Sequence, residues 1–290
     1  MPNWSYTYYT LTGDAGQIKA LHGIMSELEN ADSQNNPGWL GHLVERLYGD
    51  NDKFLCRGSW NDLELRDDNS LCFSVKHAWR HPDYMEDLIR SKFDKVYIYY
   101  QEQEPEDGIF TTNDLRGEHY PETIFLDAGG NIDYYVGEDV FAALSKIGGK
   151  PITSWDEAFA LVDSNEDIQL IEIEYDQRGP EPRDVMFHEF NTKQYKEFLQ
   201  GLIRTLSDSE IESAYLEWGQ EGFHDSGGCK YGNLEGGKDG LLAAAAEIPS
   251  EDVEGIWMSW NGGYIKTKPL SKGKYLCTVN MYKIDHYCPV

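Results

Sequence analysis

The sequence predicts an α+β fold whose first part is an antiparallel β-sheet in βαββαβ order, with its helices on one face. Residues 4–12 (WSYTYYTLT) and 96–100 (VYIYY) are rich in the aromatic and β-branched residues that favour strands. Residues 71–75 alternate apolar and polar side chains, which predicts a strand with one buried face. Between these strands, apolar residues recur at steps of three and four, the spacing of one face of a helix.

The connecting elements complete the predicted order. Asp14 is expected to cap the first helix, because an aspartate side chain accepts hydrogen bonds from the free amides of the first turn. Residues 31–53 are expected to be an insertion that holds a short second helix. Residues 54–65 predict the second strand, interrupted at Gly58, and Pro82 fits the first turn of the helix before the fourth strand.

This order of elements is the ferredoxin-like, or split βαβ, arrangement. It predicts a first domain over residues 1–130 and leaves residues 131–290 as a second α+β domain, whose topology the pattern does not give. In the second domain, capping boxes at Ser154–Glu157 and Ser207–Glu210 predict helix starts, and Asn191 or Thr192 begins another helix. The helix after Ser207 is expected to bury Ile211, Ala214, Tyr215 and Trp218. A hairpin at 255–268, a strand at 274–284 and a glycine-rich loop at 219–240 are also expected.

Three segments of the first domain resemble a known family. They are the opening Pro2–Ser5, the strand corner His77–Pro82 with its Trp-x-x-Pro, and the acidic run YYQEQEPEDG at 99–108. Together they look like the ferredoxin-like domain of YubB-like proteins, over residues 2–127. The family's Trp-Gly-Thr-Lys-Trp-like block is represented here only by Gly58–Asp62.

The resemblance implies a ferredoxin-like fold and a setting on plasmids, phages or integrated elements. The biochemical function of the family is not established, so the resemblance transfers no active site. Tyr6 and Tyr8 also stand where the family has smaller polar residues.

The net charge of −26 limits the kinds of partner that the protein can bind. Residues 1–135 carry 11 Lys/Arg and 24 Asp/Glu, and residues 136–290 carry 14 and 27, so each part has a net charge of −13. Direct binding of nucleic acid is disfavoured, because it needs a basic face. Two alternatives stay open: an acidic surface that only aids solubility, or a surface that mimics a nucleic-acid backbone and docks onto a basic partner.

The five cysteines and the N-terminal sequence predict a cytoplasmic protein. The number of cysteines is odd and no CxxC pair occurs, which is typical of reduced thiols. The N-terminus lacks the basic and apolar regions of a secretory signal, and no apolar run is long enough to span a membrane.

The motifs tested for chemistry do not predict a catalytic residue, a cofactor or a metal. Gly232–Asp239 is close to a phosphate-binding loop, but Asp239 replaces the hydroxyl residue that binds Mg²⁺. His224, Asp225 and Cys229 are three side chains that can bind a metal, yet the second ligand pair of a structural zinc site is missing. The alternative hypothesis is therefore an enzyme with a metal or carboxylate site near the loop at 219–240.

The tryptophans give the candidate binding surface. Trp4, Trp60 and Trp79 fall at strand ends of the first domain, where they either pack into the core or act as interface anchors. Our leading hypothesis is a non-enzymatic protein of a mobile element that binds a protein partner, with a basic or nucleic-acid-binding protein as the specific version. The sequence does not identify the partner.

Overall fold

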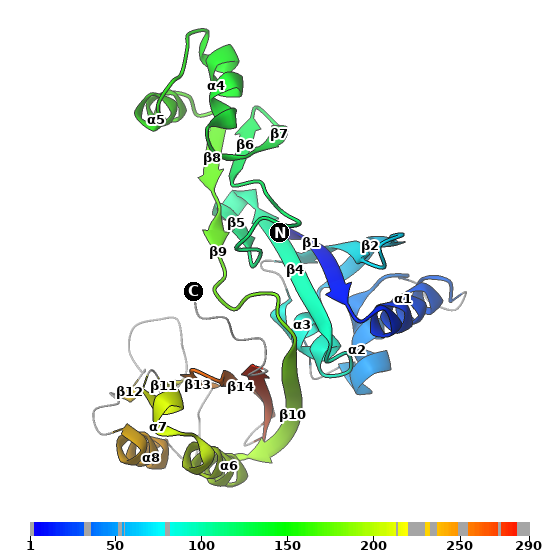
Figure 1. The fold of residues 1–290 in the computed structure, drawn as a ribbon, viewed down its shortest axis with the longest axis vertical. Helices are drawn as coiled ribbons and strands as arrows, with labels where there is room; N and C mark the ends of the chain where they lie inside the picture. The colour runs from blue at the N-terminus through cyan, green and yellow to red at the C-terminus, as the bar shows by residue number, and fades with distance from the viewer. Residues whose placement is uncertain are drawn as a thin grey trace. The chain divides into compact units, whose positions relative to one another are not determined.

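The computed structural model shows an α+β protein whose described residues form three β-sheets, each with helices connected to it (Figure 1). It describes residues 3–31, 36–51, 54, 56–78, 82–212, 214–219, 230–232, 237–248, 255–271 and 274–282. The chain divides into two compact units. The first contains residues 1–46, 56–83 and 96–180, and the second contains residues 47–55, 84–95 and 181–290.

The main sheet of the first unit has the predicted ferredoxin-like connectivity. Its strand order is β2-β3-β1-β4-β5-β9, so β3 lies between β1 and β2 while β1 lies between β3 and β4. All neighbours are antiparallel except β5 and β9. The strands are β1 (Trp4–Gly13), β2 (Gly58–Leu65), β3 (Leu71–Ala78), β4 (Val96–Glu104), β5 (Ile109–Thr112) and β9 (Glu174–Tyr175).

Helix α1 (Ala15–Glu29) follows β1 and is capped as predicted, because the Asp14 carboxylate accepts a hydrogen bond from the Gln17 amide at 2.9 Å. The insertion contains α2 (Leu40–Tyr48).

A second, three-stranded sheet of the order β7-β6-β8 completes the first unit. Its elements are β6 (Ile124–Ala128), β7 (Asn131–Tyr135), α4 (Val140–Gly148), α5 (Trp155–Asp163) and β8 (Ile168–Glu172); the short 3₁₀ turns Pro105–Asp107 (η2) and Gly137–Asp139 (η3) precede β5 and α4. Gly129 and Gly130, both with positive φ, turn β6 into β7. The predicted boundary at residue 130 therefore falls within a hairpin of the first unit, and β9 returns the chain to the main sheet.

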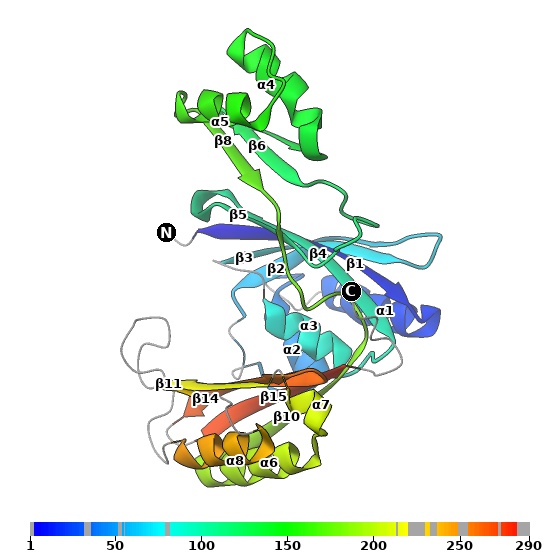
Figure 2. The ribbon, with the colours of Figure 1, turned by 60° about the vertical axis from the view of Figure 1, so that its left-hand side comes forward.

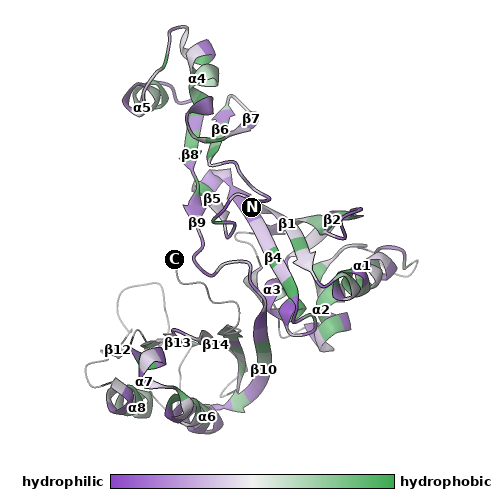
Figure 3. Ribbon diagram, in the orientation of Figure 1, coloured by the Kyte–Doolittle hydropathy of each residue, from purple (hydrophilic) through white to green (hydrophobic). Residues whose placement is uncertain are grey.

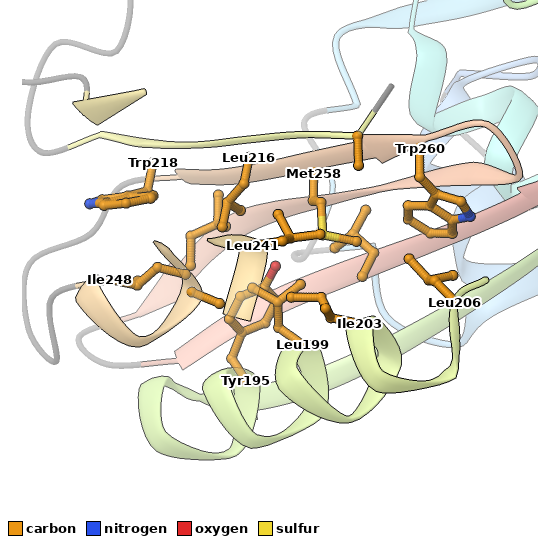
Figure 4. Packing of buried hydrophobic residues seen from close by; sticks show 14 of the residues in the cluster. Tyr195, Leu199, Ile203, Leu206, Leu216, Trp218, Leu241, Ile248, Met258 and Trp260 are labelled. Atoms are coloured by element: carbon orange, nitrogen blue, oxygen red, sulfur yellow. The ribbon is translucent and has the colours of Figure 1, made fainter. Parts of the chain in front are cut away.

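The second unit is built around one six-stranded antiparallel sheet of the order β10-β15-β14-β13-β11-β12. Helices α6 and α8 cover one of its faces (Figure 2), and their apolar side chains pack against strand residues such as Leu216 and Met258 (Figure 4). The elements are β10 (Arg183–Asn191), α6 (Thr192–Thr205), α7 (Asp208–Ile211), β11 (Tyr215–Gly219), β12 (Lys230–Gly232), α8 (Gly237–Glu247), β13 (Gly255–Trp260), β14 (Gly263–Ser271) and β15 (Lys274–Tyr282).

The prediction of a helix that buries Tyr215 and Trp218 is wrong. The capping box at Ser207 and Glu210 is present, but α7 ends at Ile211 and the chain continues as strand β11. Leu216 and Trp218 are buried at a spacing of two, and β11 pairs with β13 on one side and β12 on the other. Pairing with two strands that are distant in sequence therefore outweighs the local helical spacing.

Helix α3 (Asp83–Arg90) belongs to the second unit although it connects two strands of the first sheet. Its Asp87 carboxylate is 2% exposed and accepts hydrogen bonds from Asn280 Nδ2 at 2.7 Å and Tyr264 Oη at 3.3 Å. The Lys266 ammonium lies 2.9 Å from the other carboxylate oxygen. Asn280, Tyr264 and Lys266 come from β14 and β15, so this polar cluster ties α3 to the second unit.

Replacing Asp87 by Ala is expected to lower the free energy of unfolding by about 3 kcal/mol, because it leaves the partly buried Lys266 charge without its counter-ion. Urea unfolding measures the change. Lys193→Ala is the control, since the Lys193–Glu197 pair is exposed and 3.9 Å apart, and its loss should cost less than about 0.5 kcal/mol. Equal losses for the two variants would contradict the role given to Asp87.

Candidate functional site

Strand β1 divides its side chains between two very different surfaces. The residues that face α1 are buried. On the opposite face three aromatic residues are exposed: Trp4 is 42% exposed, Tyr6 37% and Tyr8 41%. The buried set is Ser5, Thr7, Tyr9 and Leu11. Because side chains alternate along a strand, three aromatic rings stand at every second position on the face away from α1.

The loop after β5 covers one end of this face. The Asp114 carboxylate accepts hydrogen bonds from the amides of His119 and Tyr120, at 2.7 and 3.0 Å, which fixes the loop. Tyr120 Oη then reaches Thr10 Oγ1 at 3.1 Å, and the His119 ring lies 4.4 Å from that of Tyr99. Burial raises the pKa of the Tyr120 hydroxyl. The end of β1 that carries Trp4, Tyr6 and Tyr8 stays exposed.

A lysine of the neighbouring strand makes cation–π contacts with two of the exposed rings. Lys76 lies opposite Tyr6 in the β1–β3 register. Its ammonium is 4.7 Å from the centroid of the Trp4 ring and 5.3 Å from that of Tyr6, within the range of cation–π attraction. The face therefore accommodates a positive charge between two aromatic rings.

A fourth ring extends the exposed surface from a different sheet. Tyr134 of β7 is 37% exposed and donates a hydrogen bond to Gln103 Oε1, opposite Tyr6 in the β1–β4 register. Burial raises the pKa of the Tyr134 hydroxyl, and the negative charge of an ionised Tyr8 raises it further. We call Trp4, Tyr6, Tyr8 and Tyr134 the aromatic row.

The structure separates the tryptophans that the sequence grouped together. Trp4 lies on the aromatic row. Trp60 is 1% exposed on the α1 face, where its Nε1 donates a hydrogen bond to the Glu29 carboxylate at 2.8 Å. Trp79 lies outside the described residues. Of the predicted surface of Trp4, Trp60 and Trp79, the two described residues, Trp4 and Trp60, therefore lie on opposite faces of the sheet.

The residues that the sequence reasoning missed are Tyr6, Tyr8 and Tyr134. The first two had a usable signal, since they follow Trp4 at a spacing of two along a predicted strand. Tyr134 had none, because its place depends on how a distant hairpin folds.

The alternative site at His224, Asp225 and Cys229 falls outside the described residues. Within the ranges that the structure describes, no group of three His, Cys, Asp or Glu side chains is arranged to hold a metal ion. The same ranges contain no helix with the length and apolar character needed to cross a bilayer.

A cluster of acidic residues lies at the end of β4, whose colouring in Figure 3 changes from hydrophobic to hydrophilic along the strand. Glu102 and Glu104 are 3% and 1% exposed, and Ser5 Oγ donates a hydrogen bond to Glu102 at 2.8 Å. The pKa of the Glu104 carboxyl is raised to about 7, first by burial and then by the neighbouring carboxyl groups of Asp107, Glu106 and Glu102. This carboxyl can hold or release a proton near neutral pH.

Comparison with protein-family models, with curated proteins and with solved structures found no match to this chain. The resemblance to YubB-like proteins therefore stays a prediction, and function has to be argued from the site itself.

Replacing Glu104 by Gln is expected to stabilise the protein by about 1–3 kcal/mol at pH 8 and by less than about 1 kcal/mol at pH 5. With a raised pKa, the folded protein binds more protons at Glu104 than the unfolded chain does between about pH 4.5 and 7, so its stability falls as the pH rises through this window. Urea unfolding at the two pH values measures the effect. Glu118→Gln, at a half-exposed carboxylate, is the control. The same gain at both pH values would show that Glu104 is already charged at pH 5.

Proposed function

We propose that the protein binds a basic segment of a partner protein on the aromatic row. The observation that supports this most directly is Lys76, whose ammonium lies over Trp4 and Tyr6. An aromatic face attracts a cation through the negative charge above its ring, and Lys or Arg side chains of a partner offer the same group. Exposed Trp and Tyr are also the residues that most often dominate binding at protein interfaces.

The charge of the protein favours the same class of partner. With a net charge of −26 in 290 residues, the protein attracts basic proteins over a distance and accelerates their encounter. Aromatic rings on a sheet can also stack with nucleic-acid bases, but such platforms work together with a positively charged groove that follows the phosphates. The negative charge of this protein opposes that function.

The finer version of the proposal is a mimic of a nucleic acid. A protein that binds nucleic acid presents Lys and Arg side chains on its binding surface. The aromatic row would bind the Lys and Arg side chains that otherwise contact the bases and phosphates of a nucleic acid. We further propose a cytoplasmic setting on a mobile element, supported by the free thiols of Cys72 and Cys277 and by the family resemblance. Anti-restriction or conjugation genes beside the coding sequence would favour this version, and a metabolic operon would count against it.

The double variant Trp4→Leu/Tyr6→Leu is expected to bind a fluorescent arginine-glycine peptide about tenfold more weakly than the wild-type protein, because two cation–π contacts are lost. Fluorescence anisotropy at low salt measures the dissociation constant. Tyr175→Leu is the control, since Tyr175 is 40% exposed but does not belong to the aromatic row.

Equal binding by the double variant and the control would mean that general charge alone holds the peptide. A glutamate-glycine peptide should not bind. Binding of a single-stranded oligothymidine instead, with loss in the double variant, would contradict the proposal and favour stacking with bases.

Lys76→Met is expected to strengthen binding of the same peptide by about twofold to fivefold, because it removes a cation that competes for Trp4 and Tyr6. Lys19→Met, on helix α1, removes the same charge from a different surface and serves as the control. A gain of the same size in both variants would show that only the net charge matters.

A further inference from the structure

We infer that the aromatic row contains a second cation position that selects arginine, formed by Tyr8 and the carboxylate of Asp62. This inference deepens the proposed function and rests on it. The first position, at Trp4 and Tyr6, is occupied by the chain's own Lys76. The second position combines an exposed ring with a negative charge.

An irregularity in β2 brings the Asp62 carboxylate to this face. The register between β2 and β3 shifts between Asn61 and Glu64, and Asp62 within the shift has a φ of 57°. Such a bulge redirects a side chain, and positive φ in a residue other than glycine is uncommon. Ser74 Oγ donates a hydrogen bond to Asp62 Oδ2 at 2.9 Å, and Ser74 is the β3 partner of Tyr8.

The carboxylate consequently lies close enough to Tyr8 to act on its hydroxyl. Burial raises the pKa of Tyr8, and the charge of Asp62 is the next cause of the increase. The hydrogen bond from Ser74 goes to one carboxylate oxygen, so the other oxygen can accept from a ligand. An exposed strand gains little stability from a residue in this conformation, which favours a functional reason for it.

A buried amide on the other side of Tyr8 points to a bound peptide. Gln101 is the β4 partner of Tyr8 and is 7% exposed. Its Nε2 has no hydrogen-bond partner among the described residues. A buried donor without an acceptor is costly, and native proteins rarely leave one unpaired. Because Nε2 is itself buried, the Gln101 side chain would have to turn outward for a backbone carbonyl of a bound peptide to supply that acceptor.

These groups favour arginine over lysine. A guanidinium is planar, stacks on an aromatic ring and presents parallel N–H donors that match a carboxylate. Tyr8 offers the ring surface, and Asp62 offers the carboxylate. A lysine ammonium is a compact, strongly hydrated charge that gains less from stacking.

Calorimetric titration of the 290-residue protein tests the inference with two peptides that differ only in carrying three arginines or three lysines. The wild-type protein is expected to bind the arginine peptide about tenfold more tightly. Asp62→Asn keeps a residue that tolerates positive φ and should reduce this preference to less than about twofold. Glu64→Gln is the matched control, because it removes the same charge two residues along β2 and should keep the preference.

The outcomes separate this inference from the proposed function. If both peptides bind equally to the wild-type protein, or if Asp62→Asn and Glu64→Gln behave alike, the arginine position is wrong. If, in that case, Trp4→Leu/Tyr6→Leu still weakens both peptides, the proposed function stands without it. If neither peptide binds the wild-type protein, both proposals fail. Unchanged urea midpoints for Asp62→Asn and Glu64→Gln ensure that the comparison is made between folded proteins.

Discussion

The pairing of β1 between β3 and β4 is the constraint on which the rest of the first unit depends. In this register, the pairs Thr7–Val75 and Thr7–Glu102 direct one set of side chains toward α1. The other set, with Trp4, Tyr6 and Tyr8, faces away from the helix. A shift by one residue would bury these rings and expose Tyr9 and Leu11, so the hydrophobic core itself fixes which face binds.

Much of the fold of the first unit was predictable because the sequence signals for it are local. The alternation around Phe73, the cap at Asp14 and the proline at 82 each act within a few residues. Where pairing is distant, prediction failed: residues 215–219 have a helical spacing of apolar residues, yet they form a strand between β12 and β13. The boundary at residue 130 failed for the same reason, since β9 pairs with β5 across more than sixty residues.

The candidate site was predictable only in part. Trp4 could be named as a strand-end aromatic residue, but nothing local distinguishes it from Trp60, which pairs with Val75 on the opposite face. The position of the Asp62 carboxylate on this face depends on a bulge that the sequence does not predict. The position of Tyr134 depends on a hairpin in another sheet. A surface gathered from three separate parts of the chain carries no compact motif, which explains why motif reasoning found no site.

The most direct test of the central claim is an NMR titration of the 290-residue protein, with labelled tryptophan and tyrosine rings, by the arginine-glycine peptide. We predict that the ring signals of Trp4, Tyr6 and Tyr8 shift with increasing peptide. The signals of Tyr9 and Trp60, which are buried on the other face, should stay in place. Shifts confined to Tyr9, Trp60 or the rings of the second unit would contradict the claim that the exposed face of β1 is the binding surface.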